Sequence, residues 1–326
     1  MKPFDRRRLL LALPAFAFLG IARAQAAPPH RVATFGFAAT HPRIRLFRES
    51  LAGVGLVEPR NLLLKSWAPH PEPADTVREI LAWQPQVVVA FGSPLARAVQ
   101  KETAAVPIVF NAGADPVAAG LVQSLARPGL NVTGVHTPYR DQFGKRIQLA
   151  REVLPRAKKM GFVFDRTPRT WTEYMEGLLR DCRKMAGDFG FAIVEADVTE
   201  DPPGLMAALE RLAKKRVEVV LVFSTIYDPR YYQALVELQK KRRIPVVEDE
   251  LASAEKGALL AVENDPVDYL RDTAEIVARI LKGARPTDIP VRVSTRFRTA
   301  VNLKAAREMG VAIPEGVRLR ADTVIQ

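Results

Sequence analysis

The sequence has little cysteine and little histidine. Cys182 is the single cysteine among 326 residues, which excludes an intramolecular disulfide, and its place in a helical pattern predicts a structural thiol. The four histidines, His30, His41, His70 and His136, lie in separate predicted loops without the spacing of metal ligands. We therefore expect neither a metal carrier nor a bound cofactor.

Templates of common enzyme active sites are also missing. Ser93 stands in FGSP (91–94) and not in a Gly-x-Ser-x-Gly elbow. There is no Gly-rich phosphate-binding loop followed by Lys and Ser or Thr, and GVG (53–55) lacks the third glycine of a dinucleotide fingerprint. These absences favour a binding protein over an enzyme.

The apolar run near the N-terminus is too short for a membrane span. It covers residues 9–21, about a dozen against the ~20 that a spanning helix needs. Basic residues precede it, and Ala24 and Ala26 suit a signal peptidase. We expect residues 1–26 to be an export signal whose removal leaves a periplasmic protein, not lipid-anchored because no cysteine is near. The run RRRLL (6–10) leaves twin-arginine and general secretion both open.

Acidic residues are outnumbered by basic ones. The formal charge is +12, and five basic residues and one acidic residue of the signal leave +8 for the rest. Basic runs such as KKRVE (214–218) and KKRRIP (240–245) lie in predicted helices, so we expect the charge to be dispersed. Without a binding motif or interleaved aromatics, this pattern predicts no nucleic-acid partner.

Short apolar runs alternate with amphipathic stretches along the chain. Such alternation predicts an α/β protein with right-handed parallel sheets. QVVVAFGS (86–93) is echoed by EVVLVFST (218–225), and VPIVF (106–110) by IPVVE (244–248), so the second half repeats the first. We expect two doubly wound lobes. The expected strands are 32–37, 62–65, 87–91, 108–110, 160–164, 192–195, 219–223, 245–247 and 258–262.

Residues 107–134 carry the clearest local pattern, strand, loop, helix and strand. Residues 108–110 form an apolar run typical of a strand buried on both faces. Asp115-Pro116 predicts a helix start, with the helix continuing through Gly120 and ending at 127–129. A further strand is expected at 131–134.

The same region resembles a known family. DPVAAGLVQSLARPGLNVTG (115–134) is similar to the signature DPVGAGLVxSLARPGGNVTG of a family of ABC-transporter periplasmic substrate-binding proteins that includes tryptophan- and phenylalanine-type binders. Further similarities lie at 51–61, 278–291 and 301–314. The resemblance implies a type I periplasmic-binding-protein fold, with two lobes, three crossovers, a solute in the cleft between them and an ABC permease as partner.

The resemblance also implies lobe limits. The first lobe would hold 28–137 plus 266–294, and the second 138–265 plus 295–326. Crossovers would lie near 133–138, 263–266 and 293–298. The chain departs from the family at Val262 and Glu263, where many members have tyrosine and glycine, and at Pro59 in place of a glycine. Because the first departure falls in a crossover, the ligand need not be that of the best-known members.

Loops at the carboxyl ends of the strands line such a cleft. We expect ligand contacts from twelve residues, and no catalytic residue. They are Thr40, His41, Gly92, Ser93, Asn111, Asp115, Asp165, Trp171, Thr225, Tyr227, Glu248 and Glu263.

Several of these residues have a second, purely structural interpretation. Ser93 either offers its hydroxyl to a carboxylate or only caps a helix. Asp115 either pairs with an ammonium or caps. Trp171 either stacks on a flat ligand or packs. The acidic run 248–250 either receives an ammonium or is solvated. Together with Asp115, it is also the remaining enzymatic alternative.

The sequence thus predicts a monomeric solute-binding protein of an ABC import system that closes about a hinge. An amino acid or related carboxylate is the favoured ligand. A sensory module that presents its ligand to a receptor or kinase is the alternative from another class.

Overall fold

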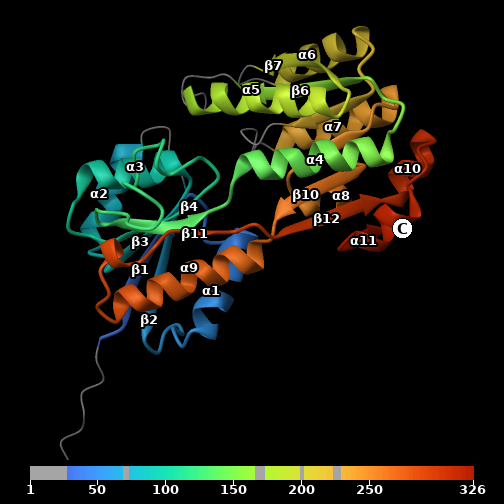
Figure 1. Cartoon of the computed structure of the whole chain (residues 1–326). Helices are drawn as coiled ribbons and strands as arrows, with labels where there is room; N and C mark the ends of the chain where they lie inside the picture. The colour runs from blue at the N-terminus through green and yellow to red at the C-terminus, as the bar shows by residue number, and fades with distance from the viewer. Residues whose placement is uncertain (1–27, 69–72, 166–172, 199–201, 223–228) are drawn as a thin grey trace, which may run out of the picture.

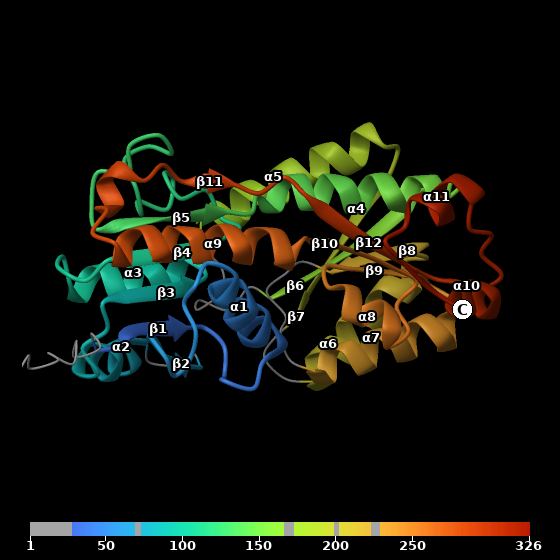
Figure 2. The same cartoon turned by 90° about the horizontal axis from the view of Figure 1, so that it is seen from below.

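The structure is a computed structural model that describes residues 28–68, 73–165, 173–198, 202–222 and 229–326. The predicted α/β class is confirmed, with two lobes lying end to end (Figure 1; Figure 2). In the described ranges the first sheet has six strands in the order β11-β5-β4-β3-β1-β2, and neighbouring strands are parallel. These strands are β1 His30–Phe35, β2 Leu62–Trp67, β3 Val87–Phe91, β4 Ile108–Ala112, β5 Val132–His136 and β11 Arg292–Val293.

The second sheet has seven described strands in the order β13-β12-β10-β9-β8-β6-β7. The strands from β6 to β10 are parallel, whereas β12 runs antiparallel to β10 and parallel to β13. They are β6 Lys159–Asp165, β7 Ala192–Val198, β8 Val219–Val222, β9 Val246–Glu248, β10 Leu260–Asn264, β12 Phe297–Asn302 and β13 Thr323–Ile325.

Helices cover both faces of each sheet because the central strands are apolar on both faces. In β3, Val87 and Val89 join the core with α1 and α9, and Val88 and Ala90 join the core with α2 and α3. In the second lobe, α4 and α5 cover one face and α6 and α7 the other. The long helices are α1 Pro42–Gly53, α2 Pro73–Ala82, α3 Ser93–Glu102, α4 Tyr139–Val153, α5 Glu173–Asp188, α6 Pro202–Lys214, α7 Pro229–Arg242 and α9 Pro266–Leu281. The short ones are α8 Leu251–Glu255, the 3-10 helix η1 Pro286–Asp288, α10 Leu303–Met309 and α11 Glu315–Arg320.

In the described ranges the chain passes between the lobes three times, after β5, after β10 and after β11. After the first passage α4 packs in the second lobe, and after the second passage α9 returns to pack against α1. The third passage leads from β11 at one edge of the first sheet into β12 (Figure 2). These connections place the carboxyl ends of both sheets toward one another.

The helix predicted after Asp115 is wrong. Residues 116–120 form turns, with the Ala119 N–H donating to the Asp115 carbonyl over 2.9 Å. Gly120 then has φ of 65°, in the left-handed region, which ends the turn. Strands β11, β12 and β13 were not predicted. None of the helices in the described ranges is long and apolar enough to cross a membrane.

Candidate functional site: a pocket between the lobes

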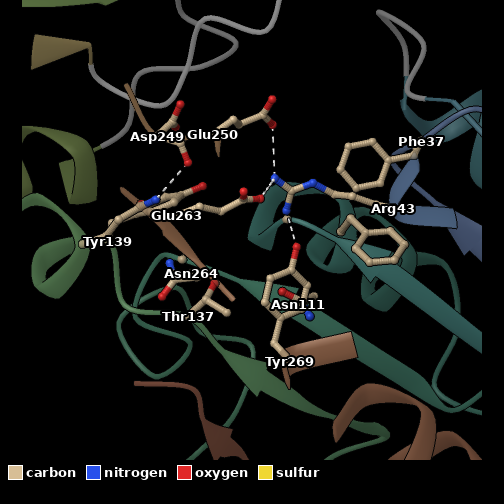
Figure 3. A pocket seen from close by; sticks show the side chains of 14 residues that line it. Phe37, Arg43, Asn111, Thr137, Tyr139, Asp249, Glu250, Glu263, Asn264 and Tyr269 are labelled. Carbon is tan, nitrogen blue, oxygen red and sulfur yellow. Dashed lines mark hydrogen bonds and ion pairs between the residues drawn. The ribbon is translucent and has the colours of Figure 1, made fainter. Parts of the chain in front are cut away.

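A pocket of about 120 Å³ lies where the carboxyl ends of the two sheets face each other. Its walls come from β3 and β4 of the first lobe, from β10 and the end of β9 in the second, and from the starts of α1, α4 and α9 (Figure 3). The lining residues are Phe37, Arg43, Phe91, Gly92, Asn111, Gly113, Thr137, Tyr139, Gln142, Asp249, Glu250, Glu263, Asn264 and Tyr269.

Arg43 bridges the lobes across this pocket. Helix α1 begins after His41, whose ring nitrogen accepts from the Arg43 N–H over 3.2 Å. The Arg43 guanidinium then donates to Glu250 over 3.1 Å, to Glu263 over 3.0 Å and to the Tyr269 hydroxyl (Figure 3). Since α1 packs with the first sheet and both glutamates follow or belong to strands of the second, this contact holds the lobes together.

Negative charge exceeds positive charge around Arg43. Asp249, Glu250 and Glu263 line the same pocket. Burial raises the pKa of Glu263 to about 7, against the opposing effects of Arg43 and of the Leu251 N–H, which donates to Glu263 over 3.2 Å. These carboxyl groups give the pocket several acceptors for a cationic group of a ligand.

An amide oxygen next to these carboxylates has no hydrogen-bond partner among the described residues. Asn264, the last residue of β10, is 6% exposed, and its Oδ1 atom accepts no hydrogen bond from any of the described residues. A buried acceptor without a donor is unfavourable by about 1–3 kcal/mol. A ligand N–H group in the pocket would supply the donor.

The opposite side of the pocket has the chemistry of an anion site. Helix α3 begins at Ser93, after Gly92 with φ of 121°, a conformation that favours glycine. Gly92 has no side chain to cap the helix, so N–H groups of the first turn point outward with a partial positive charge. The Ser93 hydroxyl is buried and has no hydrogen-bond partner in the described part of the chain.

Aromatic rings form another part of the pocket wall. The ring centres of Phe37 and Phe91 are 5.0 Å apart, and the Arg43 guanidinium lies 5.8 Å from the ring centre of Phe37 and 6.0 Å from that of Tyr269. Tyr139 lies against Gly113, where a Cβ atom would overlap its ring. Such a wall suits a flat or apolar side chain.

A second pair of buried titratable side chains lies behind the pocket. Glu248, 1% exposed at the end of β9, has a pKa raised to about 8 by burial and by Asp249. Arg146 of α4 is fully buried and donates to the Val222 carbonyl over 2.6 Å. Its Nε and Nη2 atoms, and Oε2 of Glu248, have no hydrogen-bond partner within the described ranges.

The predicted site residues are distributed over several places. Gly92, Asn111 and Glu263 line the pocket. Ser93 adjoins it as the first residue of α3 and is not the cap, which is Gly92. Asn111 donates to the Thr273 hydroxyl over 3.2 Å.

The other first-lobe residues do not line this pocket. Thr40 is exposed, and His41 caps α1 and stacks on Phe37 at 4.2 Å, where burial and then Arg43 lower its pKa. Asp115 is exposed and accepts from the Val117 and Ala118 N–H groups, so it serves as a cap. It borders a separate pocket of about 400 Å³ between the start of α4 and the middle of α5.

In the second lobe, the acidic run is divided by the end of β9, which is Glu248. Glu248 is buried behind the pocket, whereas Asp249 and Glu250 line it. Asp165 ends β6, but its side chain lies outside the described structure, as do Trp171, Thr225 and Tyr227. No cluster of His, Cys, Asp and Glu suited to a metal ion occurs in the described ranges.

Sequence reasoning missed the residues that helices bring to the pocket. These residues lie within the first four positions of α1, α4 and α9. They are Arg43, Tyr139, Gln142 and Tyr269. The sequence pattern pointed only to loops that follow strands. The crossovers provided a signal for Tyr139 and Tyr269, since each follows a predicted passage between lobes.

Comparison with known proteins agrees with this architecture. Residues 44–325 match the family of ABC transporter substrate binding proteins. A tyrosine-binding protein of Clostridioides difficile is 26% identical over 216 residues, 66% of this chain and 60% of the relative. The chain thus spans less than two thirds of that relative's length.

Solved structures show the same fold. An ABC domain from Streptococcus pneumonia in complex with L-Trp has a TM-score of 0.79 and 23% identity, covering 91% of this chain and 100% of the other. A conserved domain protein from Vibrio cholerae has a TM-score of 0.78 and 26% identity, covering 90% and 99%. The chain belongs to the family of ABC transporter substrate-binding proteins, with a type I periplasmic-binding-protein-like fold.

Proposed function

We propose that the protein binds a single amino acid between its lobes and delivers it to the permease of an ABC importer. The lobes are residues 28–137 plus 266–294 and residues 138–265 plus 295–326. Residues 1–26 direct export, and the remaining chain acts as a monomer in the periplasm. It works by binding and release, without catalysis and without a nucleic-acid partner.

The observation that carries this proposal is the opposite polarity of the two ends of the pocket. Gly92 lines the pocket, and the start of α3 next to it offers N–H groups to a carboxylate, with the buried Ser93 hydroxyl, which has no hydrogen-bond partner among the described residues, adjoining them. Glu263, Glu250 and the unpartnered Asn264 oxygen offer acceptors to an ammonium. An amino acid carries both groups on one carbon atom, whereas a sugar carries neither.

The aromatic wall favours an amino acid with an aromatic side chain. Phe37, Phe91, Tyr139 and Tyr269 line the pocket beside the charged groups. The named ligands of similar proteins, tyrosine for a relative and L-Trp in a solved complex, belong to the same chemical class. At about 120 Å³ the cavity is small beside the ~300–1,000 Å³ of drug-sized pockets, so an aromatic ring would enter as Arg43 moves aside.

Hinge closure then follows from contacts to both lobes. A carboxylate held by α3 and an ammonium held by β10 connect the two lobes through the ligand. If the closed form is about one part in a hundred without ligand, several kcal/mol of preferential binding make it the major form. Two charged contacts in a partly buried cleft supply an amount of that order.

Calorimetry with matched ligands tests the proposal. Protein refolded to remove bound solute is titrated with L-tyrosine, L-tryptophan and L-phenylalanine, and with analogues lacking one charged group, such as tryptamine and indole-3-propionate. We expect at least one amino acid to bind, and each of its truncated analogues to bind at least about tenfold more weakly, since each loses a charge-assisted contact.

Two variants serve as the test and its control. Glu263→Gln removes an acceptor in the pocket, and Glu49→Gln changes an exposed glutamate of α1 whose partner at 4.0 Å is Arg45. We expect only the first to weaken binding. An analogue without its ammonium that binds as tightly as the amino acid would contradict the proposed orientation.

A further inference from the structure

The distribution of charge over the second lobe has a consequence beyond solute binding. Strands β6, β7, β8, β9 and β10 all run in the same direction, so their amino ends lie along one edge of the sheet. Five segments lead into these strands at that edge. They are 154–159, 188–191, 214–218, 240–245 and 255–259.

These five segments gather nearly all the excess charge of the molecule. They contain eleven lysines and arginines and three acidic residues, Asp188, Glu218 and Glu255, for a net charge of +8. Residues 28–326 as a whole carry 43 basic and 35 acidic residues, the same net charge. The basic runs that look dispersed in the sequence are therefore brought together by the fold, and the prediction of dispersal is wrong.

All eleven basic residues are exposed. We call this surface the basic pole and define it by Arg156, Lys158, Lys159, Lys214, Lys215, Arg216, Lys240, Lys241, Arg242, Arg243 and Lys256. Arg242 forms an ion pair with Glu210 at 2.8 Å, and the Lys159 ammonium donates to the Lys215 carbonyl over 3.2 Å. Much of the positive charge at the pole thus faces solvent.

Stabilisation of helix ends does not account for this concentration. Cations near a helix C-terminus are favourable, and several pole residues end α6 and α7. The first lobe has the same design, with segments 54–61, 82–86, 101–107, 127–131 and 282–291 leading into its parallel strands. Those segments carry five basic and three acidic residues, a net charge of only +2.

The pole lies at the end of the molecule remote from the pocket. Carboxyl ends of the strands meet at the interlobe pocket, so the amino ends of β6 to β10 point away from it. In Figure 2 this end lies at the right, near α10 and the C-terminus. A surface bound there leaves the solute pocket open.

We propose that the basic pole attaches the protein electrostatically to a membrane surface rich in anionic phospholipid. The cations come from four of the five segments and neither described pocket reaches them, which fits a broad layer of headgroups. Phe189, 37% exposed in segment 188–191, adds one apolar side chain at this end of the lobe. Attachment would keep the protein near a membrane-embedded partner without closing the pocket.

Co-sedimentation with lipid vesicles tests this proposal. The probes are vesicles of phosphatidylcholine with about a third phosphatidylglycerol, and vesicles of phosphatidylcholine alone. We expect residues 27–326 to bind the anionic vesicles only, and binding to be lost at about 1 M salt, where the Debye length is about 3 Å.

A matched pair of variants separates the pole from overall charge. Lys214, Lys215, Lys240 and Lys241→Gln removes four positive charges from the pole. Arg60, Lys101, Arg127 and Lys282→Gln removes four from the equivalent edge of the first lobe, where all four residues are also exposed. Because each cation near an anionic surface contributes to attachment, we expect the first variant to bind at least about tenfold more weakly and the second to resemble the parent.

Circular dichroism and thermal unfolding confirm that both variants are folded. Absence of vesicle binding by the parent, or equal losses in both variants, would overturn the proposal. Binding to a soluble polyanion such as heparin but to no vesicle would also overturn it, because the pole would then recognise a polymer. None of these outcomes bears on amino-acid binding, which calorimetry measures separately.

Discussion

The protonation state of Glu263 is central to the chemistry of the pocket. Its pKa of about 7 places it between the charged and neutral forms near neutral pH. A ligand ammonium placed beside it favours the ionised form, because an opposite charge lowers the pKa of a carboxyl group. Ligand binding is therefore coupled to loss of a proton wherever Glu263 is still protonated.

This coupling predicts that affinity rises with pH. Below about pH 7 binding must remove a proton from Glu263, so the dissociation constant should fall by up to about tenfold per pH unit from about pH 5.5 to 7 and then level off. Calorimetric titrations with the amino acid selected by the panel measure this. The Glu263→Gln variant should bind weakly with little pH dependence, and a parent protein with flat affinity would contradict the role of Glu263.

Glu248 gives a separate prediction about stability. Its pKa is about 8 in the folded protein and near its model-peptide value of about 4.3 in the unfolded chain, so folding favours the protonated form. The resulting contribution to the free energy of unfolding is fully present below about pH 4 and is lost as pH rises through about 8. Ionised Glu248 is opposed mainly by burial and by Asp249, with Arg146 as partial compensation.

We therefore expect the ionisation of Glu248 to lower the melting temperature of the protein by about 5 °C between about pH 5 and about pH 8.5. Glu248→Gln keeps the shape and stays neutral, so its melting temperature should depend less on pH and exceed the parent's at the alkaline end. Scanning calorimetry of both proteins across this range is the measurement. Parallel profiles for the two proteins would show that Glu248 is ionised in the fold.

Among the secondary-structure elements of this chain, the strands were the most predictable from the sequence. Strands such as β3 are apolar on both faces and bounded by turn residues, which periodicity alone reveals. Strands β11 and β13 have two and three residues and lie at sheet edges, where apolar periodicity is weak. Strand β12 was missed because its first three residues, Phe297, Arg298 and Thr299, are only partly buried.

Local sequence signals also locate the start of a helix better than they predict how far the helix continues. Asp115 does accept from the N–H groups of Val117 and Ala118, as a cap should. The segment nevertheless stops after one turn at Gly120, so a correct start was extended into a wrong helix. A start signal fixes the first hydrogen bonds, whereas continuation depends on residues farther along and on packing.

The site was only partly predictable for a related reason. Gly92, Asn111 and Glu263 lie at strand ends, which sequence order locates once the sheets are known. Arg43 reaches the pocket from α1 through pairing with Glu250 and Glu263, more than 200 residues away in the chain. Such a contact depends on how the lobes meet, which local pattern does not specify.

The proposed amino-acid binding and the proposed membrane attachment both rest on the direction of the parallel strands in the molecule. Carboxyl ends of the two sheets meet at the pocket, and the amino ends of the second sheet form the basic pole. The proposed solute site and the proposed attachment surface thus lie at opposite edges of the second sheet. This arrangement lets each be altered without the other, as the matched variants require.

We propose that the lobes close over an amino acid held by its two charged groups. Small-angle X-ray scattering of residues 27–326, without solute and with a saturating amount of the amino acid selected by calorimetry, measures this closure. We expect a smaller radius of gyration with the amino acid than without it. Saturated binding with an unchanged scattering profile would contradict closure between the lobes.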